Sequence, residues 1–184
     1  ELFRDLPKLN AGEKLDFISI KNKINNSSLK KLHILDENSD IVTQNICRPN
    51  KKEDLEIYKI VLAEKKKGKC LKYTDLPKEL IFHKNLYSFL DRFKALDGEG
   101  ISHTMLAHIS KDGHYYIHPD IFQNRSITVR EAARIQTFPD DYFFEDSRTA
   151  AFVQIGNAVP PLMAEIIAQK IKNLLDNYLI INED

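Results

Sequence analysis

The pattern of apolar and polar positions predicts a first helix over residues 51–67. Its apolar side chains recur three and four residues apart on one stripe, at Leu55, Tyr58 and Leu62. Asn50 can cap this helix with Glu53 at the third helical position, and Gly68 can close it. The lysines near its end suit the negative end of a helix dipole.

A second run of apolar residues at helical spacing precedes Asp97-Gly98 and predicts a short amphipathic helix. Its members are Leu86, Phe89, Leu90 and Phe93. Residues 103–109 and 114–117 look extended on either side of Lys111-Asp112-Gly113, which predicts a β-hairpin. Short strands are also expected at Ile34-Leu35 and at residues 40–42, around a polar loop at 22–31.

The last third of the chain carries the strongest helix signals. Thr128 and Glu131 form a capping box at the start of one helix. Another helix is expected over residues 148–155, with Gly156 in a left-handed conformation after it. Pro160-Pro161 then opens a final helix. The final helix has a wide apolar stripe that must pack on the chain's own core or on a partner, made of Leu162, Met163, Ile166, Ile167, Ile171, Leu174 and Leu175.

The composition is that of a soluble globular chain of about one domain. Of its 184 residues, 42% are hydrophobic and 29% are charged, which excludes disorder, collagen and a disulfide scaffold. No apolar run approaches the roughly 18 residues that span a bilayer, and the N-terminus does not resemble a signal peptide. Cys47 and Cys70 stand in no CxxC arrangement, which fits reduced thiols. We therefore expect a cytoplasmic protein with no membrane partner.

The charges cancel over the whole chain but not along it. Residues 45–94 carry 13 basic and 7 acidic side chains, whereas residues 95–184 carry 7 basic and 13 acidic ones. A basic segment can face the phosphates of DNA, but on charge alone a solvated, lysine-rich helix face is favoured. The candidates for phosphate contact are Lys65, Lys66, Lys67, Lys69 and Lys72.

Signals for a metal or nucleotide site are weak. The six glycines form no phosphate-binding loop, so a nucleotide-type cofactor would not be held by this chain alone. Four histidines invite a metal-site interpretation, namely His103, His108, His114 and His118. No cysteine accompanies them and extended strands would scatter them, so we expect no metal.

Two segments carry a family resemblance. NRSITVREAARIQTFPDDYFF at 124–144 and QIGNAVPPLMAEIIAQKI at 154–171 resemble the ninth and tenth signature motifs of the DNA (cytosine-5)-methyltransferases. Both stand in the family's order, and the match runs almost without interruption over 113–171. LFRDLPKLNAGE at 2–13 is similar to the stretch after the eighth motif, and residues 71–109 resemble the end of the family's target-recognition region.

The resemblance also identifies what this sequence lacks. Members of the family attack C6 of cytosine with a cysteine thiolate in a Pro-Cys-Gln sequence, whereas Cys47 lies in Ile-Cys-Arg and Cys70 in Lys-Cys-Leu. The glycine-rich cofactor loop, the Glu-Asn-Val motif and the Gln-x-Arg-x-Arg motif are absent as well. The chain is expected to be the C-terminal portion of such an enzyme, with no catalytic residue of its own and no activity alone.

The resemblance implies an α+β fold. Most of the chain would be the small target-recognition domain of a cytosine-5 DNA methyltransferase, followed by a C-terminal helix that normally packs on the S-adenosylmethionine-binding catalytic domain. Residues 1–13 would be the connector from that domain, 14–145 the target-recognition domain with the ninth motif, and 146–184 the tenth motif with the docking helix. Here that helix is expected to be exposed, buried against the small domain, or paired with a second copy of the chain.

The two motifs imply roles for particular residues. Those of the ninth motif would organise the recognition region, because paired guanidinium and carboxylate groups are rigid and directional. They are Arg125, Arg130, Glu131 and Arg134. A plainer interpretation makes them surface ion pairs of small value. Residues of the tenth motif would help to close the S-adenosylmethionine site together with the catalytic domain, and these are Gly156, Asn157, Ala158 and Val159.

The function implied by the resemblance is recognition of duplex DNA for methylation of cytosine C5, in restriction–modification or in regulation, at a prokaryotic nucleoid. Two alternatives stay open. The chain could be one subunit of a split methyltransferase, or a stand-alone DNA-binding or assembly module without chemistry. Its first residue is Glu1 rather than methionine, which favours a shortened form of a longer chain over both.

Overall fold

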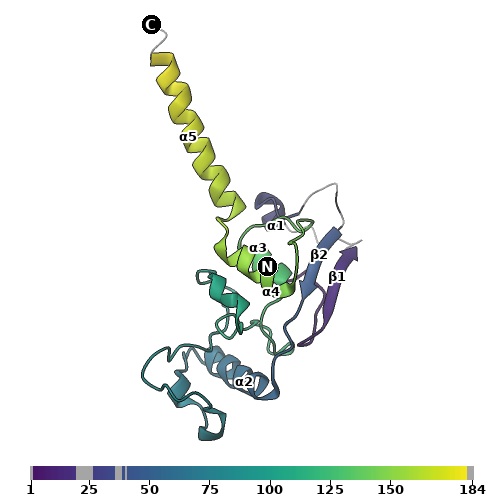
Figure 1. Ribbon diagram of the computed structural model, residues 1–184, viewed down its shortest axis with the longest axis vertical. Coiled ribbons are helices and arrows are strands. Elements are labelled where there is room, and N and C mark those ends of the chain that lie inside the picture. Colours follow the sequence, from purple (N-terminus) through teal and green to yellow (C-terminus); the bar gives the residue numbers. More distant parts are fainter. Residues whose placement is uncertain (1, 20–26, 36–38, 40, 182–184) are drawn as a thin grey trace.

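The computed structural model describes residues 2–19, 27–35, 39 and 41–181, in which a small sheet lies at one edge of a group of helices and loops (Figure 1). Figure 1 shows α2 and the loops after it at one end of the molecule, and α5 leaving the body at the other. The strands are β1 (Lys14–Ser19) and β2 (Ile41–Ile46), and the α-helices are α1 (Ser27–Lys31), α2 (Lys52–Lys66), α3 (Val129–Ile135), α4 (Arg148–Asn157) and α5 (Pro161–Ile181). Short 3₁₀ helices are η1 (Tyr73–Asp75), η2 (Lys78–Leu80) and η3 (Ala107–Ser110).

The sheet is a two-stranded antiparallel ribbon in which β2 lies against the core and β1 is largely exposed. The edge of β2 that does not pair with β1 is covered by residues 140–144, which follow α3. There the backbone N–H of Thr43 donates to the carbonyl of Asp140 over 2.9 Å. The Gln44 side chain both donates to the Phe144 carbonyl, over 2.9 Å, and accepts from the Phe144 N–H, over 2.8 Å. Residues 140–144 thus take the place of a third strand.

The strand predicted near residues 40–42 is confirmed from Ile41 onward, while Asp40 lies outside the described residues. The strand predicted at Ile34-Leu35 is wrong. These two residues follow α1, and the Ile34 N–H donates to the carbonyl of Leu29, so they cover that short helix instead of pairing with a strand. Of the polar loop predicted at 22–31, residues 27–31 form α1 and residues 22–26 lie outside the described part.

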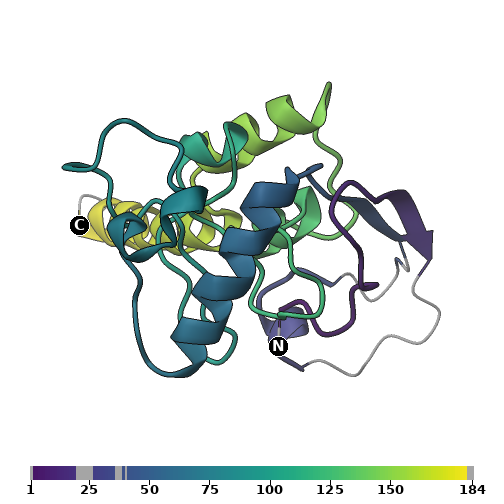
Figure 2. The same cartoon turned by 90° about the horizontal axis from the view of Figure 1, so that it is seen from below.

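Helix α2 confirms the first predicted helix, but with a different cap. The backbone N–H of Lys51 donates to the carboxylate of Asp54 over 3.2 Å, so Lys51 and Asp54 take the places expected of Asn50 and Glu53. The Asn50 amide instead donates to the Tyr58 hydroxyl, over 3.1 Å. Gly68 follows the helix with a φ of +76°, the left-handed conformation that glycine adopts without strain. Figure 2 shows α2 lying across the body of the molecule.

The helix predicted from Leu86 to Phe93 is wrong, since this segment is irregular. The Asn85 side chain accepts hydrogen bonds from the backbone N–H groups of Tyr87 and Ser88, over 3.0 and 3.1 Å. These two bonds have the geometry of a helix cap, but no helix follows because the Arg92 side chain binds carbonyls of this segment and Phe89 has a left-handed φ of +54°. Phe93 is the member of the apolar run that is buried.

The predicted β-hairpin is also wrong. Residues 107–110 form η3 rather than a strand, while Ile117 makes isolated bridges with Ala95 and Ser126. The turn itself is present, with Gly113 at a φ of +74°. The hairpin does not form because η3 packs against α4. The backbone of residues 114–118 instead bonds to residues 94–96 on one side and to residues 125–127 on the other.

The capping box at the start of α3 is confirmed by reciprocal hydrogen bonds. The Glu131 N–H donates to the Thr128 hydroxyl over 3.0 Å, and the Thr128 N–H donates to the Glu131 carboxylate over 2.8 Å. The final helix begins at Pro161 as predicted. The prediction for Gly156 is wrong, because α4 continues through it to Asn157.

Gly156 is required for close packing rather than for a left-handed turn. A Cβ at this position would lie 2.4 Å from the Cα of Ala107, in the backbone of η3. This contact joins α4 to η3 within the largest of the three hydrophobic clusters of the described residues, which collects side chains from α3, α4 and η3. The second cluster lies between α2 and the segments around Tyr73, Phe93 and Ile117.

Candidate functional site

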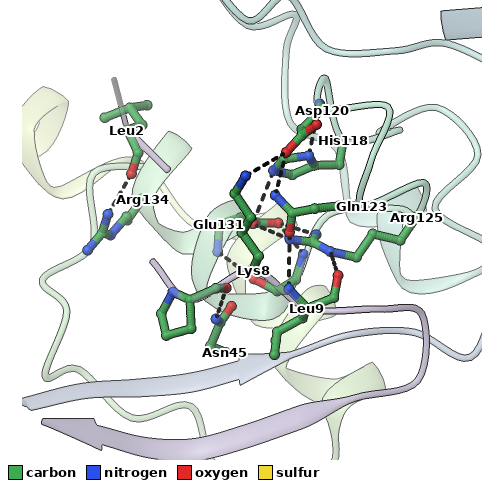
Figure 3. Close-up of polar contacts among 12 residues, drawn as sticks. Leu2, Lys8, Leu9, Asn45, His118, Asp120, Gln123, Arg125, Glu131 and Arg134 are labelled. Atoms are coloured by element: carbon green, nitrogen blue, oxygen red, sulfur yellow. Dashed lines mark hydrogen bonds and ion pairs between the residues drawn. The ribbon is translucent and has the colours of Figure 1, made fainter. Parts of the chain in front are cut away.

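A buried ion pair occupies the centre of the ninth motif. Two nitrogens of Arg125 donate to the two oxygens of Glu131, each over 2.7 Å, and both side chains are almost fully buried. Arg125 also donates through Nε to the backbone carbonyl of Leu9 over 3.0 Å. Figure 3 shows Leu9, Gln123 and His118 gathered around this pair. The pair therefore connects α3 with the N-terminal segment.

The Arg125–Glu131 pair sets the ionisation of both groups. Burial opposes the charge on Glu131, but the hydrogen bonds from Arg125, together with the His118 ring 3.4 Å away, outweigh it and hold the pKa of Glu131 below the ordinary value. Burial likewise opposes the charge on Arg125, and its bond to Glu131 raises the pKa in compensation. Both side chains are therefore charged inside the protein.

Arg134 forms a second buried ion cluster, one turn further along α3. Its Nη1 donates to Asp5 over 2.6 Å and to the Leu2 carbonyl over 2.5 Å. Its Nη2 donates to Asp140 over 2.6 Å. Burial disfavours the charged guanidinium, but the bonds to Asp140 and Asp5 raise the pKa of Arg134 above its ordinary value. The N-terminal segment is thus fastened to α3 a second time.

Arg130 is buried, and among the residues that the structure describes no carboxylate is bonded to it. Its guanidinium donates to the backbone carbonyls of Thr43 and Pro139, each over 2.7 Å, to that of Tyr142 over 2.6 Å, and to the Thr43 hydroxyl. Burial lowers the pKa of Arg130 to about 10. The side chain joins α3 to β2 and to the segment that covers it.

These contacts overturn the interpretation of the ninth-motif residues as surface ion pairs. The side chains of Arg125 and Arg134 are 0% exposed, and Arg130 is buried as well. The sequence alone did not predict the two partners of Arg134, which are Asp5 and Asp140. Asp5 lies 129 residues from Arg134 in the chain, so local spacing carries no signal of their contact.

Residues of the tenth motif form the junction between α4 and α5. Gly156 and Ala158 are half-buried, whereas Asn157 and Val159 are exposed. The Gln136 amide donates to the carbonyls of Ile155 and Ala158, over 3.0 and 3.4 Å. The packing of Gly156 against η3 accounts for that glycine without a ligand. Asn157 and Val159 have the exposure that contact with a cofactor would require.

The structure separates the five candidate lysines into two groups. Lys65 donates to the Ala95 carbonyl over 2.7 Å, and Lys67 and Lys69 lie 2.5 and 4.0 Å from the Glu64 carboxylate. Lys66 and Lys72 are exposed. The last two are the best placed to contact phosphate.

The two cysteines lie in different surroundings. Burial raises the pKa of the Cys47 thiol to about 12, so it is protonated at neutral pH. Cys70 is exposed on the segment after α2. The four candidate histidines lie in different surroundings, and among residues that the structure describes no group of three His, Cys, Asp or Glu side chains could hold a metal ion.

One stretch, Arg148–Tyr178, is long and apolar enough by length and composition to cross a membrane. Its mean hydropathy over an 18-residue window is high enough for a membrane span, although the sequence has no uninterrupted apolar run of that length. The stretch is two helices, α4 and α5, separated by residues 158–160. Core helices of soluble proteins pass the same test, so the finding is a weak indication of a membrane span.

The comparison with protein families is decisive. The family model for C-5 cytosine-specific DNA methylases matches residues 4–173. The chain belongs to this family. This confirms the resemblance in the ninth and tenth motifs, and the methylase match extends over the N-terminal segment that Arg125 and Arg134 bind.

Relatives of this C-5 cytosine methylase chain are type II methyltransferases. It is 54% identical over 142 residues to M.Bpa9945I of Bacillus paralicheniformis, covering 77% of this chain and 32% of the relative. It is 45% identical over 84 residues to M.AgeI of Thalassovita gelatinovora, covering 46% of this chain and 19% of the relative. The chain thus spans about a third or less of the length of these enzymes.

A solved structure shares the methylase chain's fold. A crystal structure of an E. coli protein, assigned as a DNA modification methyltransferase encoded within a prophage, matches with a TM-score of 0.57 and 25% identity. The match covers 95% of this chain and 46% of that protein. The mixed arrangement of helices and a small sheet therefore occurs within a DNA methyltransferase.

Proposed function

We propose that this chain is the target-recognition portion of a DNA (cytosine-5)-methyltransferase. In the complete enzyme it would hold duplex DNA while C5 of cytosine is methylated, with S-adenosylmethionine supplying the methyl group. The observation that carries this proposal is the buried arginine network of α3. It fastens the N-terminal segment, β2 and the ninth motif into one rigid unit, as a support for DNA-contacting loops requires.

The proposal divides the chain by task. Residues 1–13 connect to the catalytic domain, 14–145 form the recognition domain, and 146–184 hold the tenth motif and the docking helix. From Met163 to Tyr178 the α5 side chains are exposed, among them seven large apolar ones: Met163, Ile166, Ile167, Ile171, Leu174, Leu175 and Tyr178. A face this apolar suits burial against the catalytic domain, on the same polypeptide or on a separate subunit.

The proposed role for the tenth motif is limited to Asn157 and Val159, whose exposed side chains would border the S-adenosylmethionine site. The chain alone is proposed to be inactive, since the Cys47 thiol is buried and protonated and Cys70 stands in Lys-Cys-Leu instead of the family's Pro-Cys-Gln. A cytoplasmic location at the nucleoid follows from the same proposal.

Binding to duplex DNA tests the proposed function. We expect the chain to bind a duplex with an affinity that falls steeply with salt, because lysines near phosphates release counterions. Lys66→Gln and Lys72→Gln should each reduce the slope of log affinity against log salt by about 1. Lys170→Gln, on α5, is the matched control and should leave the slope unchanged. Fluorescence anisotropy measures all four proteins.

Two results would contradict the proposal. Affinity that does not change with salt would show that the basic segment is only a solvated surface. Transfer of a methyl group from S-adenosylmethionine to DNA by the pure chain would show that a nucleophile is present after all.

A further inference from the structure

The segment from Phe82 to Arg92 is a closed loop whose shape is fixed from inside. Three contacts of Arg92 hold it. Its Nε donates to the Phe89 carbonyl over 3.0 Å, and its Nη2 donates to the carbonyls of Asn85 and Ser88 over 3.1 and 3.2 Å. An arginine that binds three carbonyls of its own loop prevents the loop from opening.

The base of this loop is fastened to the buried ring of Tyr73. The Arg92 guanidinium lies 4.2 Å from the centre of that ring, in a cation–π contact. The Tyr73 hydroxyl accepts from the backbone N–H groups of Phe82 and His83, over 2.7 and 3.0 Å. Tyr73 itself packs in the hydrophobic cluster of α2. The loop is therefore a rigid extension of the core.

This rigid loop directs aromatic side chains into solvent. Tyr87 is 96% exposed and Phe89 is 78% exposed. Phe89 also has a left-handed φ of +54°, a conformation that is unfavourable for a non-glycine residue. Neither ring stabilises the folded chain by burial. Both rings are therefore available to be covered by a binding partner.

The charged side chains in and next to the loop are mostly basic, which favours a polyanionic partner. Lys84, Arg92 and Lys94 lie in or next to it, with Asp91 as the acidic side chain among them. Lys72, the exposed candidate for phosphate contact, is adjacent in sequence to Tyr73. The loop also forms one wall of a groove of about 690 Å³, so it is accessible along its side as well as at its tip.

We propose that the loop over residues 82–92 is the element of this chain that contacts DNA bases, with Tyr87 and Phe89 as the specificity-determining side chains and Arg92 as the residue that positions them. The inference rests on the proposed function and names the part that would read sequence. Rigid aromatic rings give base contacts at a small entropic cost, while the neighbouring lysines bind phosphate without regard to sequence.

The test is selection from a pool of duplexes of random sequence, followed by affinity measurement on the enriched duplex. We expect the unsubstituted chain to enrich one sequence. Tyr87→Ala and Phe89→Ala should each lower its affinity for that duplex by about tenfold or more while leaving the salt slope unchanged, because an apolar contact to a base edge is lost and no phosphate contact is removed. Phe122→Ala, at an aromatic ring 88% exposed outside the loop, is the matched control and should have no effect.

A second variant tests the positioning role. Arg92→Lys keeps the positive charge but lacks the planar fork of N–H groups that reaches the three carbonyls and lies on the Tyr73 ring, so discrimination between the enriched duplex and a random duplex should fall while the salt slope is retained. Circular dichroism confirms that each variant is folded.

Three other outcomes would overturn the inference, and they differ in whether the proposed function fails with it. If Tyr87→Ala and Phe89→Ala enrich the same sequence with unchanged affinity, the loop does not read DNA, while the proposed function stands. If the unsubstituted chain binds DNA but enriches no sequence, the inference fails in the same way. If it binds no DNA at any salt concentration, both the inference and the proposed function fail.

Discussion

At the scale of single residues, three buried arginines hold together parts of the chain that are far apart in sequence. The capping box of Thr128 and Glu131 could be predicted, because it depends on residues three positions apart. The second role of Glu131, as the partner of Arg125, could not, because it depends on burial. The same is true of Asp5, whose distance from Arg134 along the chain hides their contact.

Removing one member of a buried pair leaves an unpaired charge in the core. Arg125→Met should therefore lower the free energy of unfolding by about 3–5 kcal/mol. Lys8→Met is the control, because Lys8 is 76% exposed and 3.8 Å from Asp120, and such pairs contribute about 1 kcal/mol or less. Urea unfolding measures both. Equal losses in the free energy of unfolding for the two variants would show that the buried pair stabilises the fold no more than the exposed pair does.

The lowered pKa of Glu131 makes stability depend on acid. Because the pKa is lower in the folded chain than in the unfolded chain, the unfolded state binds more protons as the pH falls. The contribution is complete above the ordinary value of 4.5 and is lost progressively below it. Glu131→Gln should thus be less stable at neutral pH and show a shallower decline in acid.

Urea titrations between about pH 6 and pH 3 measure this decline. Glu56→Gln, an exposed side chain on α2, is the matched control and should retain the full slope. An unchanged slope in Glu131→Gln would mean that other carboxylates carry the acid sensitivity.

At the scale of elements, periodicity predicted the helices that have one continuous face and failed where side chains bind the backbone. Helices α2 and α5 lie where their apolar stripes indicated. The segment from Leu86 to Phe93 has equally regular spacing, yet Arg92 binds its carbonyls and Phe89 has a left-handed φ, which together exclude a helix. Spacing shows where apolar residues recur, but not which polar group competes for the main chain.

Gly156 gives a test at this scale. Gly156→Ala places a Cβ 2.4 Å from the backbone of Ala107, so α4 and η3 must move apart. We expect a loss of about 1–3 kcal/mol in the free energy of unfolding. Gly68→Ala is the comparison, because its Cβ would meet nothing within 4 Å and only the backbone strain at a φ of +76° remains, costing about 1 kcal/mol. A smaller loss at Gly156 than at Gly68 would contradict the packing role.

At the scale of the whole molecule, α5 is the feature that the rest of the chain does not explain. Its apolar stripe was predicted, but the sequence could not tell whether the chain's own core covers it. The structure leaves it exposed. A helix with this much apolar surface drives association when its partner is missing.

We therefore expect the isolated chain to self-associate through α5. Analytical ultracentrifugation should show species heavier than the 21.3 kDa monomer, increasing with protein concentration. A variant with both Ile171→Glu and Leu174→Glu should sediment as a monomer, whereas Lys172→Glu, on the same turn of the helix, should still associate. A monomer at every concentration for the unsubstituted chain would contradict this role for α5.

The anchoring of two distant segments on α3 also has a mechanical consequence. Leu2 and Asp5 are held by Arg134, while the start of α5 is held just after α3, where the Leu162 N–H donates to the Thr137 hydroxyl over 3.1 Å. A force applied between Leu2 and Leu162 would therefore pass through α3 and bypass α2 and the loop at 82–92. Because α2 and this loop lie outside that path, the length and sequence of the loop can differ between relatives without loosening the contacts that anchor Leu2 and Leu162 at α3.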